Sequence, residues 1–485
     1  MKHRFHTYLL TLISVLILSC NKFHDEILPQ DELPLSTVYQ TAADLESAIN
    51  GVYNVLQGNY LAGQNLIQIP ELMSGNGTFY IAGIPESLDL ANRNLRSSNL
   101  NATNFWIEAY KAINLANAVL EALGTVVDPA LTIDLNNKLE GEALFIRAYL
   151  HFELVRYFGQ PYGDNSPENG VPIATKAILK KSDITYPARA SVQEVYDQVM
   201  QDLLHAGDLL PASQPVYRAN PRAVKALLAR VAFQMGDYGT ASTYAKSLIE
   251  DEPGLVLNAT PEEFYTNESS AEAIWVVKFT TSDASSIAFW FDKTRNRIGL
   301  SPSLKSDFEA IATPSQKSAA QLAGLSIVDL RSTVPLISSD TLFTNKYEDI
   351  AGLGDDTPMA RLAEFILMRA EALARGGDMP GSIELLNQIR ARSLRVRDAS
   401  GNENPGDQQI VLFKPEDFAD ADALIDAIVL ERRVELCFEG NYFQDLIRLH
   451  RDIEGLPFDA CPCRLPIPQQ EIDVNKNLKQ NESCY

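Results

Sequence analysis

The sequence contains the same helical hairpin more than once, and this repeat limits the folds open to the chain. Residues 361–393 hold two apolar runs with a helical spacing of three and four, separated by a turn that contains Gly377. Residues 227–249 align with them without a gap, and Gly236 falls at the matching place in the turn. Residues 425–438 begin a third copy. Stacked hairpins cover one another's apolar faces, so the repeat predicts a mostly α-helical, tetratricopeptide-like fold.

The segments between the copies are long and do not repeat. The same periodicity predicts further helices at residues 41–58, 105–123, 136–158, 191–210 and 221–235. One strand is expected, at residues 273–280, from its β-branched and aromatic side chains. Glycine, proline and asparagine predict turns and long loops at residues 59–103 and a loop at residues 159–186. Mixed loops and short elements are expected at residues 282–357, and a proline-rich tail with polar turns at residues 457–485. We therefore expect helical pairs with long irregular loops and a few short strands.

The N-terminus has the layout of an export signal. Two basic residues precede an almost wholly apolar run, residues 8–19, which is too short to span a bilayer and resembles a secretory signal peptide. The run ends in a small residue and Cys20, which is similar to the lipobox of bacterial lipoproteins, where that cysteine is acylated. The alternative is a plain signal peptide with a chance cysteine. We predict a signal peptide (1–19), a lipid on Cys20 and a polar tether (20–40).

The other cysteines suggest one disulfide. Cys461, Cys463 and Cys484 lie close together near the C-terminus, and an exported protein folds in an oxidising compartment. A bond from Cys484 to either Cys461 or Cys463 is the expectation. A zinc site is less favoured because no histidine lies in that segment. Cys437 lies within an apolar helical run and is expected to be a small core residue.

The charge of the chain excludes one class of partner. The formal net charge is −22 and the pI is near 4.7, and no basic cluster is longer than two residues. Binding to nucleic acid requires a basic surface that neutralises phosphates, so we do not expect a nucleic-acid partner. The excess of acidic residues is otherwise explained by the need to keep the protein soluble.

Four motifs, spread over most of the chain, carry a family resemblance. They are GEALFIRAY at residues 141–149 with YFGQP at 157–161, RLAE and RAE within residues 361–371, ERRVELCFEG and DLIR within residues 431–448, and LPIPQQEID at residues 465–473 with the asparagines that follow. In this order and behind the lipobox, they resemble the SusD/RagB family of nutrient-binding lipoproteins of the Bacteroidetes. Lys476 stands where the family usually has a proline.

The resemblance implies both an architecture and a role. It implies a single SusD-like unit at residues 41–485, with an N-terminal part at 41–250 and a C-terminal part at 300–485. It also implies a lipid-anchored protein on the surface of the outer membrane, which captures oligosaccharides and delivers them to a SusC-like TonB-dependent transporter. Such proteins bind without catalysis. No cofactor is implied, and nothing in the sequence indicates bound calcium.

Three other functions remain open at this stage. The first is a glycoside hydrolase carried on the helical scaffold, the second is a binder of peptide or another non-glycan nutrient, and the third is a scaffold that binds only protein. The six histidines lack His-Glu-x-x-His spacing, and the sequence contains no Gly-x-Ser-x-Gly, phosphate-loop or Gly-x-Gly-x-x-Gly motif. Metal-dependent, serine-hydrolase and nucleotide chemistry are therefore not indicated.

Some conspicuous residues are expected to belong to the core. A buried charge that loses its partner costs about 3–5 kcal/mol, so charged residues on apolar helices should form ion pairs between helices. The motif residues in this class are Arg147, Glu371, Glu431, Arg432, Glu435 and Arg448. The tryptophans that fit helix and strand patterns are Trp106 and Trp275.

Aromatic residues on loops are the candidates for ligand contact, because a flat aromatic ring can cover the apolar face of a pyranose. Phe79 and Tyr80 follow Asn76 in a glycine-rich segment. Trp290 lies in the run FWFDKTRNR, which ends at Arg297 and combines three aromatic residues with cations. We predict that these five residues form the ligand site. The alternative is that both aromatic groups pack under their own loops.

Overall fold

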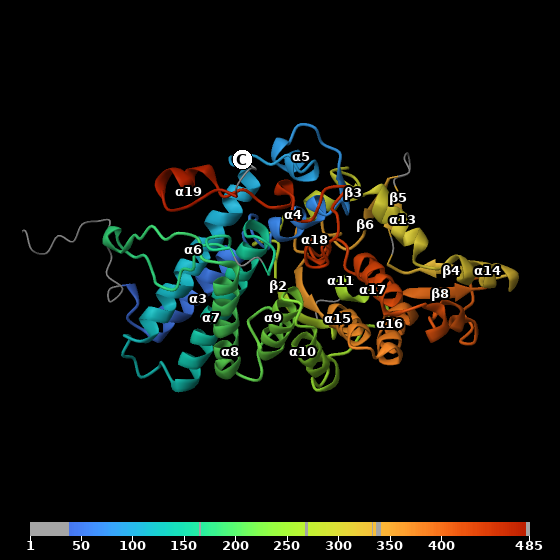
Figure 1. The fold of residues 1–485 in the computed structure, drawn as a ribbon. Helices are drawn as coiled ribbons and strands as arrows, with labels where there is room; N and C mark the ends of the chain where they lie inside the picture. Colours follow the sequence, from blue (N-terminus) through green and yellow to red (C-terminus); the bar gives the residue numbers. More distant parts are fainter. Residues whose placement is uncertain (1–37, 164–165, 267–269, 332, 336–340, 482–485) are drawn as a thin grey trace, which may run out of the picture.

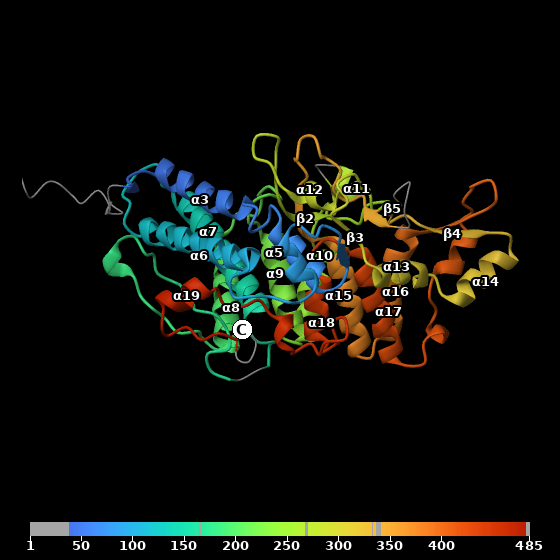
Figure 2. The same cartoon turned by 90° about the horizontal axis from the view of Figure 1, so that it is seen from above.

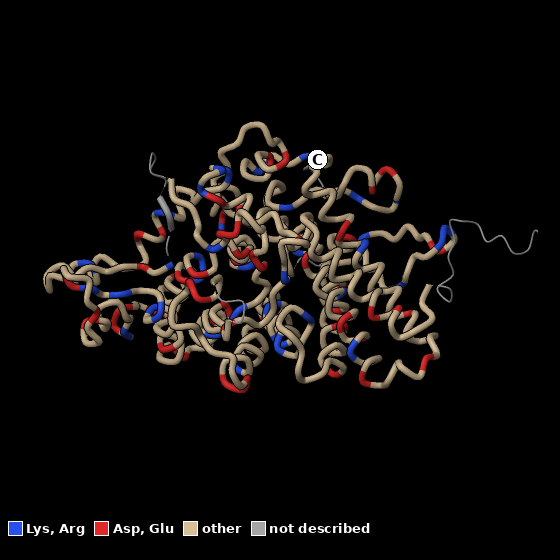
Figure 3. Tube along the Cα trace, turned by 180° about the vertical axis from the view of Figure 1, so that it is seen from behind, with Lys and Arg blue, Asp and Glu red and all other residues tan. Residues whose placement is uncertain are grey.

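The computed structural model describes residues 38–481, except for residues 164–165, 267–269, 332 and 336–340. The predicted lipidation site Cys20 lies outside the described residues, as do the signal peptide (1–19) and nearly all of the tether (20–40). No helix in the described part combines the length and the apolar character needed to cross a membrane. Acidic positions are distributed along the whole trace, with basic positions between them (Figure 3).

Helical pairs stand side by side in a row that makes up most of the described molecule (Figure 1). The pairs are α3 (Ala42–Gln57) with α6 (Leu100–Leu123), α7 (Ile133–Phe158) with α8 (Val192–Leu209), α9 (Pro221–Gln234) with α10 (Tyr238–Glu250), and α15 (Leu362–Arg375) with α16 (Met379–Ser393). Because α10 packs against α15, the row continues across the long segment between the two repeats. α17 (Ala421–Glu435) packs on α15, and α18 (Tyr442–Arg448) follows it. The mostly α-helical, tetratricopeptide-like fold is confirmed.

The turn inside two of these pairs explains why the sequence repeats there. Gly236 and Gly377 adopt φ values of +76° and +86°, a left-handed backbone that glycine reaches without steric cost. The next residues, Asp237 and Asp378, cap the second helix: each carboxylate accepts a hydrogen bond, at 3.0 Å, from the backbone N–H three residues on. The Gly-Asp dipeptide thus ends one helix and begins the next.

Shorter elements complete the fold, and several of them lie above the row in Figure 1. The helices are α4 (Asn65–Met73), α5 (Pro85–Ala91), α11 (Glu263–Thr266), α12 (Ile287–Phe291), α13 (Pro302–Ala310), α14 (Pro314–Leu322) and α19 (Gln469–Val474), with single 3-10 turns at Lys181–Asp183, Asp407–Val411, Pro415–Asp417 and Cys461–Cys463. The strands form antiparallel pairs: β1 (Gly77–Phe79) with β3 (Ile298–Leu300), β2 (Ala273–Val277) with β7 (Thr357–Arg361), β4 (Ser326–Asp329) with β8 (Leu394–Arg397), and β5 (Thr333–Pro335) with β6 (Leu342–Thr344). The predicted strand corresponds to β2.

Residues 59–103 were predicted as a long loop, and this prediction is wrong. The segment contains α4, α5 and the first residues of α6. α4 is only nine residues long and contains Pro70, and glycines and asparagines surround it, so the sequence predicted turns there. Every residue of α4 is buried, and packing on all sides stabilises this short helix. Its polar side chains are held by internal partners: Gln68 Nε2 donates to Ser87 Oγ at 3.1 Å, and Glu71 accepts from Asn76 Nδ2 at 2.9 Å.

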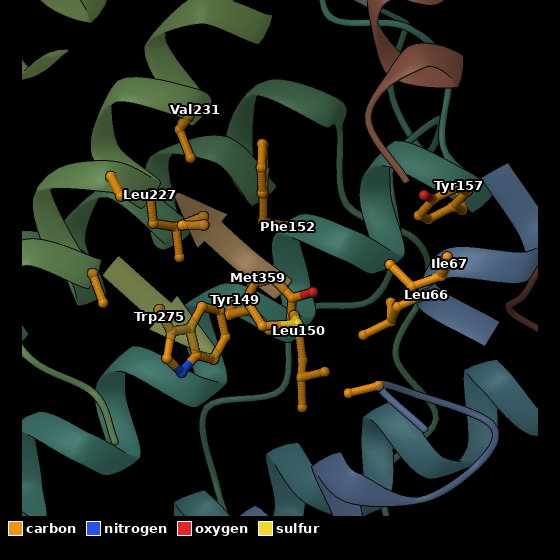
Figure 4. Packing of buried hydrophobic residues seen from close by; sticks show 14 of the residues in the cluster. Leu66, Ile67, Tyr149, Leu150, Phe152, Tyr157, Leu227, Val231, Trp275 and Met359 are labelled. Carbon is orange, nitrogen blue, oxygen red and sulfur yellow. The ribbon is translucent and has the colours of Figure 1, made fainter. Parts of the chain in front are cut away.

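The hydrophobic core joins the helical row to the β2–β7 pair. Figure 4 shows Trp275 of β2 beside Tyr149 of α7 and Met359 of β7, with Leu227 of α9 nearby. The rings of Phe145 and Tyr149 meet Trp275 edge to face, each with centroids 4.9 Å apart. Trp275 is 2% exposed and Trp106 is 3% exposed, so both tryptophans expected in the core are found there.

A buried ionic network connects the strands to the C-terminal helices. Arg361, at the end of β7, donates to Glu272 at 2.8 Å, to Glu435 at 2.7 Å and to Glu439 at 2.7 Å. Arg392 of α16 donates to Glu272 at 2.9 Å and also to Glu435. All five side chains are buried. Burial alone would raise the pKa of the Glu435 carboxyl, but the surrounding guanidiniums outweigh it and lower that pKa below its usual range.

The charged motif residues are also paired, as expected. The pairs are Arg147 with Asp202 at 2.7 Å, Arg448 with Glu371 at 2.7 Å, Arg432 with Asp445 at 3.1 Å, Glu431 with Arg331 at 2.6 Å and with Arg390 at 2.8 Å, and Glu435 with Arg361 and Arg392. Each of these pairs joins two different helices, or joins a helix to a neighbouring strand or loop. The interpretation of these residues as structural is confirmed.

The cysteines are placed as follows. Cys461 is disulfide-bonded, whereas Cys463 is a free, buried thiol, and Cys484 lies outside the described residues. Cys437 is a buried free thiol, and burial raises its pKa to about 12. The expectation that Cys437 is a small core residue is confirmed.

We predict that Glu435→Gln destabilises the protein by about 3–5 kcal/mol, because it leaves Arg361 and Arg392 buried with too little negative charge. Urea unfolding followed by circular dichroism measures the change. The control is Glu384→Gln, an exposed carboxylate on α16, which should shift stability by no more than about 0.5 kcal/mol. Equal effects of the two substitutions would contradict a central role for the network.

We also predict a loss of stability in mild acid that is due to His151. Its Nδ1 contacts the Arg147 carbonyl oxygen at 2.9 Å, its Nε2 accepts from the Ala174 N–H at 3.1 Å, and burial lowers its pKa to about 4. The neutral ring therefore stabilises the fold fully above pH 6.5, its unfolded pKa, and this contribution is lost as the pH falls towards 4, by about 3 kcal/mol in all. His151→Gln should flatten the stability profile between pH 6.5 and 4.5, and an unchanged profile would contradict the assignment.

Candidate functional site

Two segments that are far apart in the sequence meet at the predicted site. β1 pairs with β3, with Gly77 opposite Leu300 and Phe79 opposite Ile298. Immediately after β1, the Tyr80 N–H donates to the Arg297 carbonyl oxygen at 2.9 Å. The structure thus brings the two predicted loops together on one two-stranded support. In the view from above, α11 and α12 lie along one edge of the molecule, with β2 beside them (Figure 2).

The helix α12 and the turn after it aim the aromatic and cationic side chains. Ile287, Ala288 and Phe291 of α12 are buried, which leaves Phe289 and Trp290 partly exposed. The carboxylate of Asp292 turns inward and accepts from the backbone N–H groups of Thr294 at 3.0 Å and Arg295 at 3.1 Å. Asn296 has φ +49°, a left-handed conformation that asparagine tolerates, and it returns the chain into β3.

The aromatic rings form a connected group. Phe79 and Trp290 have ring centroids 6.4 Å apart, and Phe289 and Trp290 have centroids 5.8 Å apart at an interplanar angle of 83°. Phe79 is buried, as the packing alternative expects, and Trp290 packs partly against the hydrophobic core. Trp290 and Phe289 are half-buried, and Tyr80 is 39% exposed. We call Tyr80, Phe289 and Trp290 the aromatic platform, with Phe79 as its support.

Two arginines lie on the platform. The guanidinium carbon of Arg297 is 4.1 Å from the centroid of Phe289 and 5.0 Å from that of Trp290. The guanidinium carbon of Arg295 is 4.3 Å from the centroid of Phe289. These are distances at which a cation is attracted to the face of an aromatic ring. The predicted polar partner Arg297 is therefore part of the same site, and Arg295 joins it.

Tyr80 depends on a glycine in the neighbouring strand. A Cβ atom at Gly299 would lie 3.1 Å from Cε2 of Tyr80 and 2.8 Å from the carbonyl oxygen of Leu342. The missing side chain of Gly299 therefore allows the tyrosine ring and β6 to approach β3. The sequence alone gave no indication of this contact, because it depends on the pairing of β1 with β3.

Asn76 is not available to a ligand. Its side chain is fully buried, and its amide is occupied by Glu71 at 2.9 Å and Arg433 at 2.9 Å. The backbone carbonyl oxygen of Asn76 accepts a hydrogen bond from the backbone N–H of Ser301 at 2.8 Å. Asn76 therefore links β1 to α4 and α17, and its side chain is not exposed for contact with a ligand, unlike the prediction.

A separate cavity of about 240 Å³ lies beside β2. Its wall includes Tyr265, Lys346, Asp349 and Asp355. Partial burial raises the pKa of Asp355 to about 6, and the neighbouring Asp349 carboxylate adds to this effect. No group of histidine, cysteine and acidic side chains able to hold a metal ion occurs in the described part of the chain.

Comparisons with known proteins agree on one family. The model of a SusD-like family, described as starch-binding and associating with the outer membrane, matches residues 28–233, and the model of the SusD family matches residues 342–455. The chain belongs to the SusD/RagB family. SusD-like protein P2 of Formosa agariphila is 26% identical over 99% of both chains.

Solved structures agree with the fold of this SusD/RagB protein. A SusD superfamily protein from Bacteroides thetaiotaomicron has a TM-score of 0.76 at 23% identity, over 91% of this chain and 99% of that chain. A structure described as a laminarin-binding SusD-like protein has a TM-score of 0.69 at 22% identity, over 92% of this chain and all of that chain. Because both sequence identities are below 25%, these structural similarities show a shared fold only.

In this SusD/RagB protein the family motifs and the candidate site are separate. The motifs supply ion pairs of the scaffold, whereas the platform comes from residues outside all four motifs. Arg295, which lies on the same ring of Phe289 as Arg297, was not among the predicted site residues. A signal was present, because two arginines spaced by one residue follow directly on the aromatic run.

We predict that Trp290 provides most of the tryptophan fluorescence that a soluble quencher can reach, because Trp106 and Trp275 are almost fully buried. Iodide should quench it more efficiently than caesium, since Arg295 and Arg297 attract an anion to the ring. Stern–Volmer titrations of the native protein and of Trp290→Phe measure both effects. Quenching that survives in Trp290→Phe would show that the platform is not exposed as described.

Proposed function

We propose that this protein binds an oligosaccharide on the aromatic platform of Tyr80, Phe289 and Trp290. The observation that carries the proposal is that the half-buried rings of Phe289 and Trp290 contact each other, that Trp290 also contacts Phe79 of β1, and that the exposed Tyr80 directly follows Phe79. The β1–β3 pair brings these two remote segments together. Exposed aromatic rings are costly in water unless a partner covers them, and the apolar face of a pyranose is a suitable partner. Membership of the SusD/RagB family supports the same ligand class.

We further propose that the protein is tethered to the outer membrane through a lipid on Cys20 and passes its ligand to a SusC-like TonB-dependent transporter. The family model that matches residues 28–233 is described as associating with the outer membrane, which supports this location. The lipobox-like residues before Cys20 support the lipid. Labelling of cells with a radioactive fatty acid, comparing the native chain with Cys20→Ala, tests the anchor, and co-purification from detergent tests the transporter.

Binding without hydrolysis is the proposed activity. A glycosidase needs two carboxylates with different roles on either side of the scissile bond. In the cavity beside β2, Asp355 has a raised pKa, but the neighbouring Asp349 accepts from the backbone N–H groups of Gly352 at 2.7 Å and Gly354 at 3.0 Å and so acts as a loop cap. Release of reducing ends from a bound glycan, abolished by Asp355→Asn, would establish the hydrolase instead.

We predict that Trp290→Ala and Tyr80→Ala each weaken the binding of the recognised oligosaccharide about 10- to 100-fold, because central aromatic contacts carry most of the binding energy at such sites. Isothermal titration calorimetry against a panel of neutral and anionic oligosaccharides measures the effect. The matched control is Tyr186→Ala, a tyrosine that is 51% exposed on a loop beside residue 477, outside the platform. Binding that is unchanged in both platform variants would move the site elsewhere.

A further inference from the structure

The arginines of the platform differ from the other arginines that the structure describes. Each of the others donates at least one hydrogen bond from its guanidinium to a carboxylate, an amide or a carbonyl oxygen. Within the described residues, the guanidiniums of Arg295 and Arg297 donate none and form no ion pair, and they lie against aromatic faces instead. In a chain with a net charge of −22, this is an unneutralised cationic spot.

The carboxylate nearest in the sequence does not pair with either arginine of the spot. Asp292 lies three residues before Arg295, but it is buried, and one of its carboxylate oxygens is used by the backbone of Thr294 and Arg295 and by the Thr294 hydroxyl. Lys293 is exposed and likewise has no carboxylate partner among the described residues. The turn therefore carries three cations, two of which lie on aromatic rings, and the described part of the protein gives none of them a carboxylate partner.

The two guanidiniums are also close enough to repel each other. Partial burial lowers the pKa of Arg297, and the charge of Arg295 lowers it further. Like charges stacked on one ring raise the energy of the unliganded site, and an anion bound to both of them would add an attractive interaction with each. Stacking on Phe289 holds the planar guanidiniums in place, so less side-chain entropy is lost when they bind an oxyanion.

We propose that the platform selects glycans that carry anionic groups, namely uronate carboxylates or sulfate esters. Trp290 and Tyr80 would cover the apolar face of a sugar ring. Arg295 and Arg297, still stacked on Phe289, would donate from the edges of their guanidiniums to the carboxylate or sulfate oxygens. This inference rests on the proposed glycan-binding function and names the substrate class of the same site. Neutral glycans would gain the stacking contacts but would leave both guanidiniums without a partner.

The test compares three probe families by titration calorimetry: oligogalacturonides, sulfated galactan oligosaccharides and neutral malto-oligosaccharides. We expect at least one anionic family to bind the native protein more tightly than the neutral one, and its affinity to fall about 10- to 100-fold in Arg295→Gln/Arg297→Gln. The two anionic families distinguish carboxylate from sulfate recognition. Raising the sodium chloride concentration should weaken the anionic ligand and leave a neutral one unchanged.

The control is Arg451→Gln, which removes a partly exposed arginine that already has a carboxylate partner in Asp426 and should change affinity less than about two-fold. If neutral glycans bind at least as tightly as anionic ones, the charge selection is overturned. The proposed glycan-binding function still stands if the double arginine variant binds these neutral glycans normally and Trp290→Ala does not. If the native protein binds no glycan of any charge, both are overturned. The salt dependence of the native protein gives a second readout that requires no variant.

Discussion

The buried network around Arg361 is the interaction on which the C-terminal half of the molecule depends. It joins Glu272 before β2, Arg392 at the end of α16, and Glu435 and Glu439 at and after the end of α17. Charges removed from water require partners at short distances and in defined directions, whereas apolar contacts tolerate small sliding movements. The network therefore specifies how the last helices sit against the β2–β7 pair, and a hydrophobic contact of the same area would not do so.

This constraint also explains why the family could be recognised from a single sequence. The conspicuous residues of the motifs, such as Arg361, Glu371, Glu435 and Arg448, are ion-pair partners that occupy fixed positions on apolar helices. Their spacing follows from the helical period, and the Gly-Asp turns follow from left-handed backbone and capping needs. The fold class and the helical pairs could therefore be predicted, since both depend on local patterns along the chain.

Features that depend on tertiary burial could not be predicted. α4 is short, contains Pro70 and is stabilised by burial on all sides, whereas its glycine- and asparagine-rich surroundings predicted a loop. The two site loops could be chosen from their composition, but only the β1–β3 pairing reveals that they meet. Likewise, the cationic run was visible in the sequence, whereas the absence of carboxylate partners for Arg295 and Arg297 among the described residues depends on distances in space.

The hydrogen bonds of Asn76 connect the helical scaffold to the strands that carry the aromatic platform. Arg433 of α17, two residues from Glu435, donates from Nε to Asn76 Oδ1 at 2.9 Å, just before β1, and to Ser303 Oγ at 3.0 Å, just after β3. One guanidinium thus ties both strands beneath the platform to the helix that carries the ionic network. Loops that carry recognition residues usually lose entropy when a ligand orders them, and a support fixed in this way removes part of that cost before binding. Asn76, predicted as a ligand contact, instead links the scaffold to the strands under the proposed binding surface.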